Sequence, residues 1–408
     1  MSRAGEILKR FGPGLITASI VLGPGSIVAS SDAGARGEYR LVWVLVGASV
    51  LMAAYTAMGA RLGCALDTSP LEHVSRRAGR WLAVLVGLSA FLVTAGFQFG
   101  NNLGVAFAAS GLVGGPVWIW PLVFTGLSLS FLFAAKHLYR WLERFMMVLV
   151  GLMILAFFTN LFWTGVDLPK LALGLVPRWA AGDAGVARAM LATTFSVVAA
   201  FYQAYLVQAK GWRREDLPSA IRDAWLGIGI LGLIAIVILV GSAQTLYGTG
   251  TITNVGQLAA QLAGTLGPAA NVVFCCGLAA ASFSSFLVNA LIGGHMLADG
   301  LGLDSRMNSL SAKVLASGVM LIGCSVAVAT VAFGYGTTAS LLTAQASTLI
   351  AAPLCAVLLF FLTCRRNPMG ELRNRWGAIV LGAVGLAVIL SLNAMGLPRL
   401  LERLFGAQ

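Results

Sequence analysis

The chain has 408 residues, of which 58% are hydrophobic and only 10% are charged. Soluble proteins carry about 25% charged residues, and a soluble fold of this length could not bury so much apolar surface. Lipid can act as solvent for such a chain, so the composition predicts a membrane protein.

Eleven runs of about 20 apolar residues predict membrane-spanning helices. They cover residues 12–35, 41–64, 81–112, 117–135, 143–165, 186–208, 219–246, 268–297, 312–335, 338–363 and 376–396. We expect an all-α polytopic membrane protein with a single transmembrane domain over residues 1–408. The first run is too long for a signal peptide, and we expect it to be retained.

The positive charges divide unevenly between the two sides of this topology. With the N-terminus in the cytoplasm, 20 of the 27 Lys and Arg residues lie inside and seven lie outside. This positive-inside pattern predicts an inner (plasma) membrane protein with a cytoplasmic N-terminus and an external C-terminus. The pattern also explains the net charge of +12 without a nucleic-acid partner.

The first span is interrupted by Gly23-Pro24-Gly25-Ser26. Proline removes a backbone donor, and the flanking glycines weaken the helix further. The motif predicts either a kink or a true break. A break at membrane depth frees backbone groups that only protein or a water-filled cavity can satisfy.

The sixth span would pass as a continuous helix, yet it carries Tyr202, Gln203, Tyr205 and Gln208. These side chains either line a site or lie at the membrane interface. Interruptions at matching positions of two halves are typical of inverted-repeat transporters. We therefore infer that helices 1 and 6 are both discontinuous, with repeat 1 at about 12–165, repeat 2 at about 186–363 and an extra helix at about 376–396.

Several motifs resemble the NRAMP family of divalent metal transporters, which have the LeuT-like 5+5 inverted-repeat fold. Residues 23–26 (GPGS) stand where the family has DPGN, and residues 140–143 (RWLE) resemble its R-x-L-E. Residues 281–285 (ASFSS) resemble A-G-Q-S-S, and Gln345 with Pro353 matches a family spacing. The motifs occur in order over nearly the whole chain.

The departures from the family are as informative as the matches. Gly23 and Ser26 replace the Asp and Asn that ligate metal in the family, and residues 200–202 (AFY) replace its M-P-H signature. Gln98 and Asn101 align with acidic residues that the family links to proton movement. Hard divalent cations need carboxylates or many carbonyl oxygens, and transition metals favour imidazole or sulfur, so we expect no metal site here.

An anion suits the altered first helix better. We expect the N–H groups of Ser26, Ile27 and Val28 to lack helical partners and to point the positive end of the dipole at the site. Gly23 removes a repelling charge. The expected substrate-binding residues are Gly23, Gly25, Ser26, Ile27, Tyr202, Gln203 and Gln345. Their side chains could instead serve as interhelical hydrogen-bonding groups.

The resemblance to LeuT-like folds implies a sodium ion between the broken first helix and hydroxyls of the eighth. Ser282, Ser284 and Ser285 supply hydroxyls there, and Asn289 lies one turn further. The same serines could simply allow close helix packing. Gln98 and Asn101, as former proton-path positions, argue against proton coupling.

The predicted function is that of a secondary transporter. It takes up a small monovalent anion, such as bicarbonate, together with sodium by alternating access. Bicarbonate is suggested by NRAMP relatives thought to carry it, and the sequence does not separate it from nitrate or formate. The alternatives are a divalent transporter for Mg²⁺ or Mn²⁺ with an altered site, and a transport-dead receptor or scaffold. We expect no enzyme activity and no cofactor.

Overall fold

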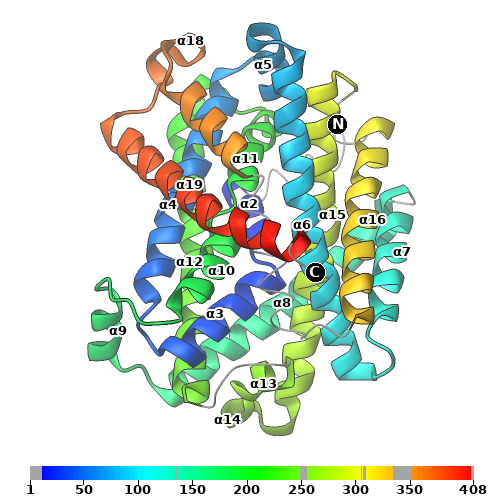
Figure 1. The fold of residues 1–408 in the computed structure, drawn as a ribbon, viewed down its shortest axis with the longest axis vertical. Coiled ribbons are helices and arrows are strands. Elements are labelled where there is room, and N and C mark those ends of the chain that lie inside the picture. The colour runs from blue at the N-terminus through cyan, green and yellow to red at the C-terminus, as the bar shows by residue number, and fades with distance from the viewer. Residues whose placement is uncertain are drawn as a thin grey trace.

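The computed structural model describes residues 12–133, 136–248, 255–304, 306, 309–333 and 352–405. For residues 136–145, 255 and 396–405 it describes the backbone alone. Throughout this part of the chain the residues form helices and turns, and there is no strand. Most of the long helices run roughly along one axis and form a bundle, which α3 and α19 cross obliquely (Figure 1).

The helices of the first half run from the interrupted first span to the end of the fifth. They are α2 (Pro13–Val21), α3 (Pro24–Gly37), α4 (Val42–Ala65), α5 (Pro70–Ala78), α6 (Arg80–Val113), α7 (Ile119–Phe133), α8 (Lys136–Thr164) and α9 (Leu168–Gly174).

The second half repeats the pattern of a broken helix followed by long ones. Its helices are α10 (Asp183–Thr194), α11 (Val197–Lys210), η1 (Arg214–Asp216), α12 (Leu217–Leu246), α13 (Val255–Ala260), α14 (Ala263–Leu266), η2 (Gly267–Ala269), α15 (Ala270–Leu301) and α16 (Leu310–Ala332). The last helices are Ala352–Cys364, α18 (Arg366–Met369), η3 (Gly370–Leu372) and α19 (Trp376–Phe405).

The helices match the eleven predicted runs. Among the described residues, eight helices are long and apolar enough to cross a membrane, and the bent pair α2 and α3 makes a ninth. Two shorter apolar helices, Ile119–Phe133 and Ala352–Cys364, fall within the fourth and tenth runs. The all-α polytopic architecture is therefore confirmed, while residues 338–351 of the tenth run lie outside the described part.

The first span is broken and not merely kinked. Helix α2 ends at Val21, α3 begins at Pro24, and the two helices are bent by 63° relative to one another. Pro24 occupies the first turn of α3, where its missing N–H would have had no helical partner. The prediction of a discontinuous first helix is confirmed.

The sixth span is also discontinuous. Helix α10 ends at Thr194 and α11 begins at Val197. Phe195 (φ −95°, ψ 68°) and Ser196 (φ −83°, ψ 93°) lie outside the helical region between them. No proline or glycine stands at this break, so local sequence could not have revealed it, and the inference from the first span is confirmed.

The helices pack as two groups. Helices α2, α3, α4, α10, α11 and α12 contact one another extensively, and so do α6, α7, α15 and α16, while α8 contacts both α12 and α15. Between the groups, α2, α3 and α11 meet α6 and α15 over much smaller areas. Both helix breaks lie on the first group, in α2–α3 and α10–α11, and these elements include the helices that face the second group.

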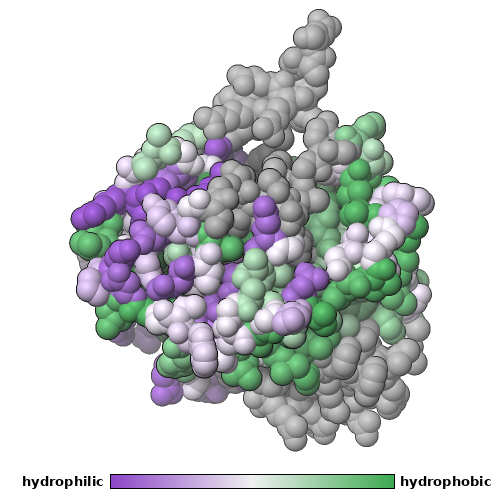
Figure 2. All heavy atoms as spheres, turned by 90° about the horizontal axis from the view of Figure 1, so that it is seen from below, coloured by the Kyte–Doolittle hydropathy of each residue, from purple (hydrophilic) through white to green (hydrophobic). Residues whose placement is uncertain are grey.

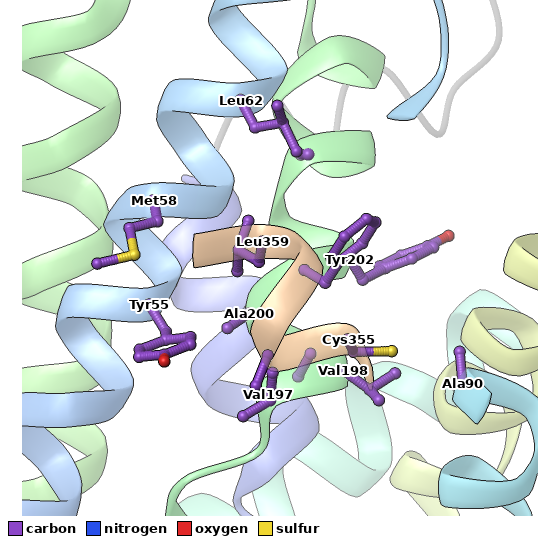
Figure 3. Packing of buried hydrophobic residues seen from close by; sticks show 14 of the residues in the cluster. Tyr55, Met58, Leu62, Ala90, Val197, Val198, Ala200, Tyr202, Cys355 and Leu359 are labelled. Carbon is purple, nitrogen blue, oxygen red and sulfur yellow. The ribbon is translucent and has the colours of Figure 1, made fainter. Parts of the chain in front are cut away.

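Apolar side chains fill the interior of the first group and also cover the flanks of the molecule. Tyr55, Met58 and Leu62 of α4 pack with residues of α11 and of the helix Ala352–Cys364, including Leu359 (Figure 3). On the flank of α8, Leu155 is 61% exposed. Seen from below, hydrophilic residues gather on the end face and hydrophobic ones lie along its rim (Figure 2), as expected for lipid-facing flanks.

Candidate functional site

At the break in the first span, the carbonyl of Val21, the last residue of α2, is satisfied by neighbouring residues of the chain. The hydroxyl of Ser26 donates to the carbonyl oxygen of Val21 at 2.8 Å, and the N–H of Gly23 donates to the same oxygen at 2.8 Å. Ser26 is 3% exposed. Its proton is therefore committed to the backbone in this structure, and only the lone pairs of its oxygen remain for another partner.

The N-terminus of α3 differs from the prediction in one respect. Gly23 is the N-cap and offers no side chain to the first turn. The N–H of Ile27 donates to the carbonyl of Gly23 at 3.4 Å, so the expectation that this N–H has no helical partner is wrong. Helix α3 begins at Pro24, and the groups of its first turn without an α-helical partner are the N–H groups of Gly25 and Ser26.

Ile27 also lies in apolar surroundings. Its side chain is fully buried in a cluster that includes Leu103 and Phe107 of α6. That position suits a packing residue of the interface between α3 and α6.

Gly23 faces two neutral polar side chains. A Cβ atom built on Gly23 would lie 3.6 Å from Oδ1 of Asn101 and 3.8 Å from Oγ of Ser285. Both are ordinary van der Waals distances, and the backbone of Gly23 (φ −110°, ψ −175°) is one that any residue can adopt. Neither space nor conformation therefore requires glycine here.

Buried polar atoms without partners occur on Asn101 and Ser285 next to Gly23, and on Gln98 about one turn before Asn101 on α6. Both polar atoms of the Gln98 amide, Nδ2 of Asn101 and Oγ of Ser285 have no hydrogen-bond partner among the described residues. These side chains are 0%, 2% and 2% exposed. Such atoms cost free energy unless a ligand or water satisfies them, so they mark a candidate binding site at the break.

The other serines of the expected sodium site on α15 already donate hydrogen bonds within their own helix. The hydroxyl of Ser282 donates to the carbonyl of Leu278 at 2.7 Å, and that of Ser284 donates to the carbonyl of Ala281 at 3.0 Å. Ser282 nevertheless lies beside the break, because a Cβ on Gly104 would contact both its Oγ and the ring of Pro24. Asn289 is buried at 6% exposure.

Gln203 binds the first half of α2. With its amide oriented to satisfy both ends, Nε2 donates to the hydroxyl of Thr17 and to the carbonyl of Pro13 at 3.0 Å, and Oε1 accepts from the N–H of Gly14 at 3.2 Å. These contacts lie more than one turn before the break. The structure thus gives Gln203 the alternative role of a hydrogen bond between helices.

Tyr202 contacts the C-terminal part of α15. Its hydroxyl lies 2.9 Å from Nδ1 of His295, and its ring stacks on Tyr205 with centroids 5.4 Å apart. Tyr205 donates to Oδ2 of Asp299 at 2.7 Å. Gln345, the remaining expected substrate ligand, lies outside the described residues.

Sequence reasoning passed over His295 and Asp299 because they stood near the predicted end of the eighth span. Helix α15 extends to Leu301, so both are buried, at 7% and 4% exposure. They are spaced i, i+4 and share one helix face. Buried ionisable residues within a spanning helix are a signal that could have identified them.

The charges around the break do not form a metal centre. Among the described residues, no group of three His, Cys, Asp or Glu side chains could hold a metal ion. Asp32 is fully buried two turns along α3, where Oδ1 pairs with Nε of Arg36 at 2.8 Å. The polar groups nearest Gly23 are an amide and a hydroxyl, which carry no charge.

A helical bundle with two broken spans and a buried polar site at one break defines a secondary transporter embedded in a membrane. The family model described as natural resistance-associated macrophage protein-like (Nramp) matches residues 14–398. The chain belongs to this family, as its sequence motifs suggested.

Curated relatives span almost the same length. The chain is 27% identical to the divalent metal cation transporter MntH of Deinococcus radiodurans over 409 residues, covering 97% of this chain and 91% of the relative. It is 28% identical to MntH of Chromohalobacter salexigens over 403 residues, covering 94% and 89%. These relatives are transporters and not enzymes.

Solved structures share the fold. A mutant of the manganese transporter of Eremococcus coleocola superposes with a TM-score of 0.79 at 16% identity, covering 97% of this chain and 87% of that one. MhsT in complex with L-phenylalanine gives a TM-score of 0.61 at 14% identity, covering 93% and 98%. The LeuT-like fold of the chain is confirmed by these neighbours.

Proposed function

We propose that this Nramp-family transporter carries a small monovalent anion, such as bicarbonate, together with sodium by alternating access. The observation that carries the proposal is the neutral surrounding of Gly23. Where the family resemblance places a metal-ligating aspartate, this chain has no side chain, and Asn101 and Ser285 face the vacated position.

The chemistry of these groups suits an anion. The amide Nδ2 of Asn101 and the hydroxyl of Ser285 are hydrogen-bond donors that lack partners among the described residues. The N–H groups of Gly25 and Ser26 open α3, whose dipole favours negative charge at this end. An anion such as bicarbonate can accept from these donors and can donate to the oxygen of Asn101.

Sodium coupling is supported by the oxygens of α15. Ser285 leaves its oxygen unbonded beside Gly23, and Ser282 has lone pairs left near Pro24. Neutral oxygens can hold a monovalent cation, which has a smaller hydration free energy to replace than a divalent one. A sodium ion here would also offset the negative charge of the substrate.

The second candidate substrate is a divalent metal cation, and the comparisons favour it over an anion. The relatives that match nearly the whole chain are named divalent metal cation transporters. A hydrated Mg²⁺ needs fewer direct ligands because it keeps several waters. The carboxylate nearest along α3 is Asp32, whose Oδ1 pairs with Arg36 and whose Oδ2 is buried without a partner among the described residues, while the groups facing Gly23 are neutral oxygens.

Uptake into proteoliposomes separates the two candidates. Purified protein is tested with labelled bicarbonate, with and without an inward sodium gradient, and in parallel with manganese and magnesium. Sodium-stimulated bicarbonate uptake without metal flux supports the anion. Metal flux without bicarbonate uptake would overturn it and establish a cation site without a carboxylate.

A variant of the site links the flux to this geometry. Asn101→Leu removes the amide beside Gly23 with little change in size. We expect it to abolish uptake of whichever ion is carried, while Asn160→Leu at the distant end of α8, also buried, serves as a control for the general cost of losing a buried amide.

A further inference from the structure

The structure holds a second buried polar cluster, separate from Gly23, at the end of the molecule that carries α5. It consists of Tyr202 and Tyr205 from α11, His295 and Asp299 from α15, and Ser69 at the start of α5. We call it the His295 cluster. Its members come from elements that are far apart in the sequence and meet in the bundle (Figure 1).

Asp299 is the most densely bonded group of the cluster. Its carboxylate accepts from the hydroxyl of Tyr205 at 2.7 Å, from the hydroxyl of Ser69 at 2.7 Å and from the N–H of Leu71 at 3.3 Å. Its backbone carbonyl accepts from Arg80 at 3.3 Å. Three hydrogen bonds therefore hold this buried carboxylate in one orientation.

His295 packs against both tyrosine rings, which also stack on each other. Its Nδ1 is 2.9 Å from the hydroxyl of Tyr202, and its ring centroid lies 5.6 Å from that of Tyr202 and 4.9 Å from that of Tyr205. Asp299 follows one helical turn later on the same face. An imidazole is the side chain whose charge changes near neutral pH, and Asp299 is the carboxylate on the same helix face.

The cluster crosses the thin interface between the two helix groups. Helix α11 packs mainly on α4, and α15 packs mainly on α6, whereas α11 and α15 touch each other at few positions. The hydrogen bonds of Tyr202 and Tyr205 lie on this small contact. Any movement of one group against the other at this end must break or rearrange them.

We propose that His295 is a proton-binding site whose occupancy, balanced by Asp299, controls the contact between α11 and α15. In the neutral tautomer that carries its proton on Nε2, Nδ1 accepts the hydroxyl proton of Tyr202. When a proton from water binds the imidazole, both ring nitrogens become donors. Tyr202 can then no longer donate to Nδ1, and this bond between the helix groups must rearrange.

Most of the other charged groups near α15 already have interaction partners. On α5 and α6, Glu72 pairs with Arg76 and Arg80, on α16 Lys313 lies over the ring of Phe133, and on α3 Asp32 pairs with Arg36. Helix α5 also carries His73 and Arg77. The described side chains of α2, α7, α8, α13 and α14 include no ionisable group, and α6 adds none beyond Arg80.

The chain offers a direct test because it has only three histidines. In the full-length His73→Gln/His137→Gln protein with ¹³C-labelled histidine, the single imidazole resonance reports His295. We expect it to titrate between about pH 5 and 8. An imidazole whose resonance stays constant over this range would overturn the proposal. The measurement needs no transported ion, so its outcome is independent of the proposed substrate.

Two further variants test whether Asp299 and Tyr202 influence the titration of His295. Asp299→Asn should lower the titration midpoint by at least about half a pH unit, because the balancing charge is lost. Tyr202→Phe should raise it by a similar amount, since a donor to the neutral ring is lost. Tyr55→Phe, which removes a buried hydrogen bond to Gly382 on another part of the bundle, is the matched control. If the midpoint moves no more in Asp299→Asn than in this control, the pairing is wrong.

A functional readout follows from the same site. The rate of transport of whichever ion is carried should depend on pH in the wild-type protein over the range in which His295 titrates. His295→Gln, which keeps hydrogen-bonding capacity without the titration, should be pH-independent there. An unchanged pH profile in His295→Gln would separate the titration from transport and contradict the proposed control of the interface.

Discussion

A Cβ atom on Gly23 would lie 3.6 Å from Oδ1 of Asn101, close enough for contact and not for collision. The two residues come from α3 and α6, so this proximity joins the two helix groups at the break. Because the space accepts a side chain, the chemistry of the site can be changed without disturbing its packing.

The first prediction uses that space. Gly23→Asp should reduce anion uptake at least about a hundredfold, because a carboxylate at about 4 Å repels an anion by some kilocalories per mole even in a moderately polar site. Gly23→Ala, which fits the same space without charge, should retain uptake within about a factor of ten. Proteoliposome uptake measures both. Equal activity of the two variants would show that the anion does not bind beside Gly23.

The second prediction compares the contributions of two neighbouring serines, Ser284 and Ser285, to sodium binding. Ser285→Ala should weaken the sodium dependence of uptake, raising the sodium concentration for half-maximal rate about tenfold, which is the effect of roughly 1.4 kcal/mol of lost binding. Ser284→Ala is the matched control, because its hydroxyl is bonded within α15. A stronger effect at Ser284 than at Ser285 would move the sodium site away from Gly23. The double replacement should resemble Ser285→Ala.

The third prediction concerns the packing of α4 on α11. A Cβ on Gly59 would lie 2.0 Å from the carbonyl oxygen of Ala200, whereas one on Gly47 of the same helix meets nothing within 4 Å. Gly59→Ala should lower the free energy of unfolding by about 1–3 kcal/mol. Gly47→Ala should leave it unchanged or raise it by up to about 1 kcal/mol. Melting temperatures in detergent compare the two, and equal values would mean that the helices do not approach this closely.

The fourth prediction concerns an ion pair between a loop and α10. Nε and Nη2 of Arg40 each lie 2.9 Å from an oxygen of Asp183, which is itself largely buried. Arg40→Gln should destabilise the protein by about 1.5–3 kcal/mol, because the partner carboxylate stays buried without its cation.

The control for this pair is Arg306→Gln. Arg306 lowers the pKa of Asp304 to about 2, but both groups are exposed to water, and exposed pairs contribute little to folding. We expect no measurable change in melting temperature. A loss as large as that of Arg40→Gln would indicate a general effect of removing surface charge.

The sequence predicted the helices well because apolar runs of membrane length are a strong signal. The break at Gly23-Pro24-Gly25 was visible for the same reason, since proline and glycine act locally. The break at Phe195 and Ser196 has no such residues, and its prediction depended on the symmetry of the repeats. The limits of the repeats themselves remain predictions.

The site was harder to predict because it depends on which side of each helix faces which neighbour. Gln98, Asn101 and Ser285 were chosen for other roles, as proton-path and sodium positions, and the structure brings Asn101 and Ser285 together beside Gly23. Gln203 and Tyr202 were expected at the same site, but their hydrogen bonds lie with α2 and α15. Their partners depend on which way each face of α11 points in the bundle, and no residue type in the sequence reports that orientation.

The hydrogen bonds at Val21 have a consequence for the empty half of a transport cycle. A carrier that works by alternating access must turn around without its cargo after each delivery. An exposed carbonyl at membrane depth would make that return step slow, because it would have to lose its water. Ser26 and Gly23 satisfy this carbonyl from within the chain, so the unloaded protein can reorient with its broken helix intact.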